Sequence, residues 1–105
     1  MPKSYNKLVR DRVPEIILAE GHTPVVTEMN QETYMIALVD KLKEAVNEYA
    51  ADPVPDILVD VLEVVYCLAE DRYNLSTEDL EALRQGKNED RGGFKKHLLL
   101  VEVKD

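Results

Sequence analysis

Acidic residues at helical spacing are the part of this sequence that could do chemistry. Asp56, Asp60 and Glu63 follow one another at i, i+4 and i+7, and the last two are the only charged residues between Ile57 and Ala69. A charge buried among apolar side chains is costly unless it is paired, protonated or bound to a metal. The stripe therefore predicts a cation as its partner.

A second acidic pair, Glu44 and Glu48, lies at i, i+4 on the preceding segment. Two antiparallel helices joined by a short turn would bring this pair opposite the first stripe. Carboxylate oxygens in that number suit Mg²⁺ or Mn²⁺, whereas one cysteine and two histidines give zinc poor support. Three alternatives stay open. Glu44 and Glu48 can belong to a solvent-exposed helix face, Asp56 can be a first-turn residue that the helix dipole favours, and Glu63 can pair with an Arg or Lys.

Two basic segments flank these acids and are candidates for holding phosphates. The first lies near the start of the chain, and the second joins cations to two glycines and an aromatic ring on which a base could stack. Each has a plain alternative, namely a charged edge, a turn or a core phenylalanine. The candidate substrate-binding residues are Lys7, Arg10, Arg12, Lys87, Arg91, Gly92, Gly93, Phe94 and Lys95.

The elements that must position these residues are mainly helical. Apolar residues at helical spacing, without Gly or Pro, predict a long helix over residues 30–51. Asp52 before a proline predicts the cap of a second helix over about residues 53–73. A capping box at Ser76 predicts a third, shorter helix through about Gly86.

The two ends of the chain predict smaller elements. Residues 10–19 form a candidate short helix that contains Pro14 and ends at Gly21. Residues 23–27 and 98–103 are rich in β-forming side chains, and we expect them to pair as a small sheet. The expected fold is therefore mainly α, with two long antiparallel helices, shorter helices and a small β pairing.

The second predicted helix is apolar nearly all round. Two long helices and one short one cannot easily cover it, so we expect a homodimer or homotetramer that completes a four-helix core across subunits. Its main apolar face is predicted to comprise Leu58, Val61, Leu62, Val65, Leu68 and Ala69.

Composition limits the remaining possibilities. A chain of 105 residues predicts a single domain, and a net charge of −8 argues against nucleic acid as the main partner. No segment approaches the roughly 20 apolar residues that span a bilayer. Because Cys67 is the only cysteine and no leader pattern opens the chain, we expect a cytoplasmic protein without a membrane role.

Four motifs together resemble one protein family. They are YNKLVRDRVPEII at residues 5–17, KLKE at 41–44, DVLEV at 60–64 and RGGF at 91–94. In this order and spacing, they resemble the MazG-like and phosphoribosyl-ATP pyrophosphohydrolase-like branch of the all-α nucleoside triphosphate pyrophosphohydrolases. The resemblance covers almost the whole chain. It implies cleavage of a nucleoside triphosphate between the α and β phosphates, with Mg²⁺ held by an EExxE and an ExxD segment.

The resemblance carries over residue by residue, with two departures. Glu44 and Glu48 match the first and last glutamates of EExxE, and Asp60 matches the aspartate of ExxD. Ala45 and Ile57 stand where the family has two further glutamates. Each departure removes an anionic ligand, so we expect weaker metal binding, with one metal in place of two or nucleotide binding without efficient hydrolysis.

The expected mechanism assigns a role to each set. Glu44, Glu48 and Asp60 bind Mg²⁺ and orient or deprotonate the attacking water, Asp56 and Glu63 assist, and the basic residues hold the phosphates. Two other classes remain: a nucleotide-binding or regulatory protein that has lost activity, and a structural helical oligomer. The nucleotide is left open, although the family branch is closer to nucleotide-pool housekeeping than to a step of histidine biosynthesis.

Overall fold

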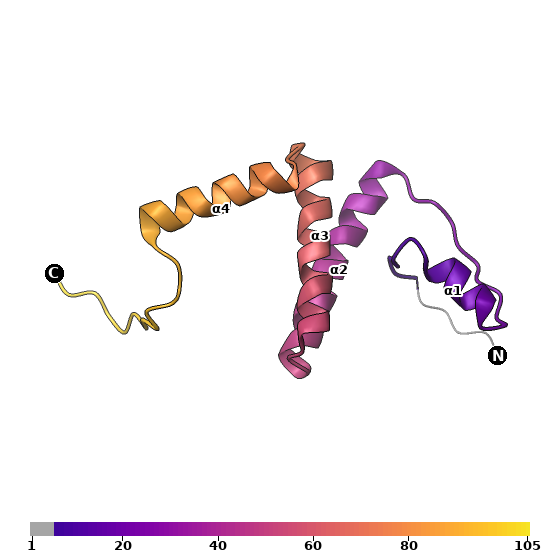
Figure 1. Cartoon of the computed structure of the whole chain (residues 1–105), viewed down its shortest axis with the longest axis horizontal. Helices are drawn as coiled ribbons and strands as arrows, with labels where there is room; N and C mark the ends of the chain where they lie inside the picture. The colour runs from indigo at the N-terminus through magenta and orange to yellow at the C-terminus, as the bar shows by residue number, and fades with distance from the viewer. Residues whose placement is uncertain (1–5) are drawn as a thin grey trace.

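The computed structural model describes residues 6–105, and its described part contains helices and no strand. The mainly α fold class is therefore confirmed. The four helices are α1 (Val13–Ala19), α2 (Gln31–Ala51), α3 (Pro55–Tyr73) and α4 (Thr77–Arg91) (Figure 1).

Helix α2 begins one residue after its predicted start, at a side-chain cap that was not predicted. Asn30 has an extended backbone and its side chain accepts a hydrogen bond from the Thr33 amide at 2.8 Å. This satisfies one of the amides that a helix start leaves without a partner. Leu38 and Ala45, seven residues apart on one face, are each only 2% exposed. That face is therefore the one α2 buries.

Helix α3 begins two residues later than predicted. Asp52 does not cap it; this residue ends α2, and its amide donates to the Glu48 carbonyl at 2.8 Å. Val54 precedes the helix in an extended conformation without a side-chain cap, and Pro55 takes the first turn. The residue before a proline disfavours the helical region, so Pro55, the second proline, sets the boundary.

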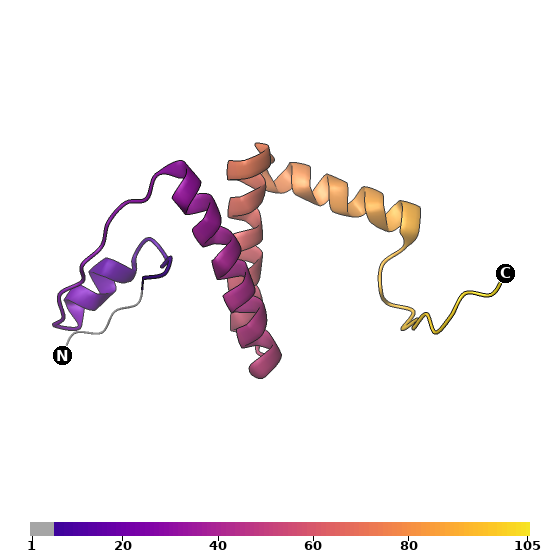
Figure 2. The same cartoon turned by 180° about the vertical axis from the view of Figure 1, so that it is seen from behind.

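The core lies between α2 and α3, which are side by side in both views (Figures 1 and 2). Val64 and Ala69 of α3 are buried with the α2 face. The predicted apolar face of α3 was wrong in part, because Leu58 and Leu62 are 49% and 48% exposed. A helix that is apolar nearly all round gives no periodic signal for which face meets its neighbour.

Helix α4 starts at the predicted capping box. The Asp79 amide donates to Ser76 Oγ at 3.1 Å, and the Ser76 amide donates to Asp79 Oδ2 at 3.0 Å. The helix continues to Arg91, beyond the predicted end at Gly86. An isolated glycine within a helix costs only about 1 kcal/mol relative to alanine, and this one does not end α4.

The predicted β pairing is wrong. Residues 23–27 and 98–103 are both irregular, and they lie on opposite sides of the α2–α3 pair in both views (Figures 1 and 2). At the N-terminal end, α1 begins at Val13, three residues after the predicted start, and Gly21 follows it with φ +87°. High β propensity in these segments therefore finds no partner strand.

The chain is extended for its length. Its radius of gyration is 18.3 Å, whereas a compact domain of about 100 residues has one of about 13 Å. Within residues 6–105, no helix combines the length and apolar character needed to cross a membrane.

Candidate functional site

The N-terminal basic segment reaches the acidic face of α2. Lys7 Nζ lies 2.9 Å from Glu44 Oε1, and Lys41 Nζ lies 3.6 Å from Glu44 Oε2. The hydrogen bond from Lys7 is the largest cause that lowers the pKa of Glu44, and Lys41 contributes further. A carboxylate with a lowered pKa is ionised at neutral pH, so Glu44 is an anion held by two ammonium groups.

The same segment also reaches α3. Arg10 Nη2 donates to Asp60 Oδ1 at 2.5 Å. This hydrogen bond is the largest cause that raises the pKa of Arg10, and the charges of Asp60, Glu63 and Asp56 add to it. The acidic stripe of α3 therefore acts on one guanidinium group. Its predicted cation partner is present, and it is a side chain of the chain itself.

We call Lys7 and Arg10 with their partners Glu44 and Asp60 the N-terminal clasp. The two pairs join residues 37 and 50 positions apart in the sequence. They bring the predicted phosphate-binding cations onto two of the predicted catalytic carboxylates. Arg12 takes no part in the clasp, because it pairs with Glu15 of α1 at 2.6 Å. Tyr5, the first residue of the YNKLVRDRVPEII motif, lies outside the described residues.

The candidate ligands suit a divalent metal by their chemistry but not by their arrangement. Ionised carboxylate oxygens are suitable ligands for Mg²⁺. However, no three His, Cys, Asp or Glu side chains of the described residues are grouped so that they could hold a metal ion. Glu44 and Asp60 face basic side chains, and Glu48 and Asp56 are exposed. The predicted ligand set Glu44, Glu48, Asp56, Asp60 and Glu63 thus does not converge in this arrangement.

Ala45 and Ile57, the two residues that depart from the pattern of the resembled family, pack within the structure. Ala45 is buried in the contact between α2 and α3, and Ile57 is half-buried on α3. A glutamate at position 45 would place a carboxylate among apolar side chains, which is costly without a partner. Alanine at this position therefore serves the helix contact.

The C-terminal basic residues are not brought to the clasp within one chain. They lie on α4 and beyond it, on the side of the α2–α3 pair opposite to α1 (Figure 1). Arg91 lies 3.9 Å from Asp90, and Phe94 is 98% exposed. The exposed candidates at this end are Lys87, Arg91, Gly92, Gly93, Phe94 and Lys95.

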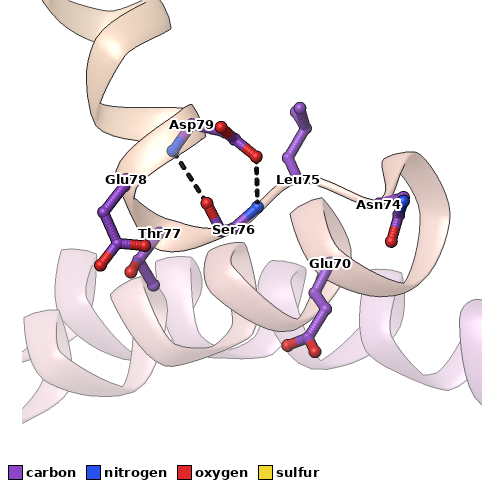
Figure 3. A pocket seen from close by; sticks show the side chains of 7 residues that line it. All are labelled: Glu70, Asn74, Leu75, Ser76, Thr77, Glu78 and Asp79. Atoms are coloured by element: carbon purple, nitrogen blue, oxygen red, sulfur yellow. Dashed lines mark hydrogen bonds between the residues drawn. The ribbon is translucent and has the colours of Figure 1, made fainter.

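Two hollows differ in their relation to the site. The larger, of about 350 Å³, lies at the junction of α3 and α4 (Figure 3), and it is lined by the capping box at Ser76 and Asp79, whose polar groups already bond to each other. A hollow of about 70 Å³ lies at the clasp between residues 6–8 and α2. Small-molecule pockets usually measure about 300 to 1,000 Å³. The clasp hollow of one chain is therefore too small for a nucleotide.

The sequence did not predict that Cys67 and Glu63 of α3 and Tyr34 of α2 influence one another. Cys67 Sγ lies 3.6 Å from Glu63 Oε2. Burial, followed by the Glu63 charge, raises the pKa of Cys67. Burial, followed by the charges of Cys67 and Asp71, raises the pKa of Tyr34 to about 12. Both groups stay protonated at neutral pH and act as donors. The i, i+4 spacing of Glu63 and Cys67 was the available sequence signal.

Comparison with known proteins gives little beyond this geometry. No family model matches the chain, and no solved structure matches it. Over 45 residues it is 49% identical to an uncharacterized protein of Mycolicibacterium smegmatis. That match covers 43% of this chain and 46% of the relative, so the chain matches less than half of the length of that protein.

Proposed function

We propose that this chain is a nucleoside triphosphate pyrophosphohydrolase that releases a nucleoside monophosphate and pyrophosphate, in the service of nucleotide-pool housekeeping. The observation that carries the proposal is the clasp. Three segments, namely residues 7–10, α2 and α3, bring two cations and two carboxylates of the family motifs together. A net charge of −8 favours free nucleotides over nucleic acid as the substrate. We propose the cytoplasm as its location.

Lys7 and Arg10 are the proposed phosphate holders next to the carboxylates. A triphosphate offers these cations several anionic oxygens, which compete with Glu44 and Asp60 for the same hydrogen bonds. A released carboxylate, with Glu48 one turn further along α2, can orient a water molecule and accept its proton. The water oxygen bonds to the α-phosphorus, the bond to the bridging oxygen breaks, and its electron pair leaves with pyrophosphate. The two cations stabilise the charge that develops.

Mg²⁺, or Mn²⁺ in its place, is the proposed cofactor because hard oxygen ligands dominate the candidate set. Its binding requires Glu44 and Asp60 to separate from the basic side chains and to converge with Glu48, with Asp56 and Glu63 nearby. The clasp and a metal ion thus compete for the same oxygens.

Pyrophosphate release from a panel of ribo- and deoxyribonucleoside triphosphates, with Mg²⁺ or Mn²⁺, tests the activity. We expect turnover by the unaltered chain and its loss in E44Q and D60N. E81Q is the matched control, since Glu81 is an exposed carboxylate of α4 that pairs with Arg84 at 2.5 Å, away from the clasp. Absence of turnover with every triphosphate would refute the proposed activity.

A catalytically weakened nucleotide-binding protein is the second candidate. The buried position of Ala45 favours it, because the missing glutamate cannot be restored there without disturbing the helix contact. Nucleotides should then raise thermal stability without releasing pyrophosphate. A ligand at 100 times its dissociation constant adds about 2.7 kcal/mol to stability, whereas a purely structural oligomer shows no such effect.

We further propose that α2 and α3 form an antiparallel pair that a second copy completes into a four-helix core, in a homodimer or homotetramer. Ile36 and Val39 support this, since they are exposed on α2 in one chain. Light scattering coupled to size-exclusion chromatography measures the assembly. A monomer at micromolar concentration would exclude it.

A further inference from the structure

The C-terminal arm, which we define as residues 77–105, has few contacts with the rest of residues 6–105 beyond the junction of α3 and α4. Beyond Leu80, every residue is exposed. Phe94 is 98% exposed, and the apolar residues of 98–103 are between 78% and 85% exposed. Single exposed apolar side chains are ordinary, but a contiguous exposed apolar segment marks an interaction site.

The exposed area of the whole chain supports a large missing contact. The accessible surface is 9708 Å², whereas a compact monomer of 12.0 kDa exposes about 6,000 Å². Obligate interfaces bury about 2,000 to 5,000 Å² in total, or about 1,000 to 2,500 Å² per chain, so the excess of about 3,700 Å² per chain is larger than one such interface accounts for. A flexible tail alone does not account for it, because α4 and one face of α3 are exposed as well.

The arm does not reach the exposed face of its own α3. The capping box at Ser76 fixes the start of α4, which then leads away from the α2–α3 pair in both views (Figures 1 and 2). Fifteen helical residues carry the chain about 22 Å from that junction. The apolar tail therefore begins at the far end of α4.

Within the arm, residues 91–101 are chemically complementary to the α2–α3 pair. Residues 91–97 contain Arg91, Lys95 and Lys96 and no acidic residue, whereas residues 31–73 contain ten acidic and three basic residues. The same pair exposes Leu58 and Leu62, which offer an apolar surface. A basic segment followed by an apolar one is thus complementary to a surface that is both acidic and apolar.

We infer that the C-terminal arm of each chain packs against the α2–α3 pair of a second copy, so that two copies exchange arms. In such an isologous contact each chain gives one arm and receives one. The partner's basic segment then lies against the acidic pair that carries Glu44 and Asp60. This inference rests on the proposed site, and it explains why one chain leaves its second set of cations far from the carboxylates.

The double variant L99E/V101E tests the exchange. Both residues are exposed in one chain, so the charges should leave helix content in circular dichroism unchanged. The dimer should dissociate to monomers in sedimentation velocity at concentrations where the unaltered chain is dimeric. V25E is the matched control, because Val25 is 97% exposed but lies outside the arm. A dimer that persists in L99E/V101E, or a monomeric unaltered chain, would overturn the inference.

Carbodiimide cross-linking identifies which chain the arm contacts. The reagent joins a lysine to a neighbouring carboxylate, and mixing ¹⁵N-labelled with unlabelled chains distinguishes links between copies from links within one. We expect Lys95 and Lys96 to be joined to acidic residues of α2 or α3 in mixed-isotope pairs. Links confined to single chains would overturn the exchange. Neither measurement depends on turnover, so failure of the arm and failure of the proposed activity are distinguishable.

Discussion

The N-terminal clasp and the C-terminal arm carry similar basic residues but have opposite environments. Lys7 and Arg10 are paired with carboxylates of α2 and α3, whereas Lys95 and Lys96 lie on an exposed arm. Leu8 of the clasp segment is half-buried, and with Ala37 of α2 it lines the hollow at the clasp. Charge alone therefore does not bring a basic segment to an acidic face; an apolar contact or a partner chain must hold it there.

The substitution with the largest expected effect disrupts the contact between α2 and α3, the two helices on which the clasp depends. A45E places a carboxylate in the α2–α3 contact and should lower the free energy of unfolding by about 3 kcal/mol or more. Urea denaturation followed by circular dichroism measures this. V46E, at a neighbouring residue that is exposed, is the control and should change stability by less than about 0.5 kcal/mol. Equal stability of the two variants would mean that α2 and α3 do not pack through Ala45.

The next prediction compares what the two basic segments contribute to activity. R10Q should reduce kcat/KM by about 10- to 100-fold, because a hydrogen bond to a charged group contributes about 1.5 to 3 kcal/mol. R91Q should reduce it too if the partner's arm supplies phosphate contacts, and its deficit relative to the unaltered chain should shrink with dilution, because a monomer lacks the partner's arm in both proteins. A drop in R91Q that is independent of protein concentration would contradict the exchanged arm while leaving the clasp intact.

The sequence predicts the parts of the fold that depend on neighbouring residues. Ser76 marks a helix start because a cap bonds to an amide three residues on. Asn30 has the same role, although its capping was not predicted. The sequence does not predict which face of α3 is buried, since Leu58 and Val64 are equally apolar and only the packing against α2 separates them. The acidic stripe predicts that Asp60 needs a cation, but the choice of Arg10, 50 residues away, depends on tertiary structure.

The same limit applies to the two ends of the chain. Residues 23–27 and 98–103 have side chains suited to strands, yet a strand needs a partner, and these two segments lie far apart in one chain. Gly92 and Gly93 suggest close approach to an anion, and the structure shows Gly92 at φ +83° after α4. Local sequence thus predicts a turn there without specifying which molecule faces it.

A smaller effect tests whether α4 is independent of the rest of the chain. A Cβ added at Gly86 meets no atom within 4 Å, and the residue lies inside a helix. G86A should therefore stabilise α4 by about 0.5 to 1 kcal/mol through helix propensity. Thermal unfolding of the dimer measures the gain. A destabilised G86A would reveal close packing against the partner chain at this position, which would narrow the path of the exchanged arm.

The smallest effect is the acid dependence of the clasp. Lys7 lowers the pKa of Glu44 in the folded chain, so this pair contributes stability above the unfolded pKa and loses it as pH falls through the lowered folded value. Both side chains are partly exposed, so the contribution should stay below about 1 kcal/mol. K7M should therefore lower stability slightly at pH 7 and converge with the unaltered chain in acid. K43M is the control, because Lys43 is an exposed lysine of α2. A constant difference between K7M and the unaltered chain at every pH would assign the role of Lys7 to packing of its methylene groups, and the clasp would then rest on Arg10 and Asp60 alone.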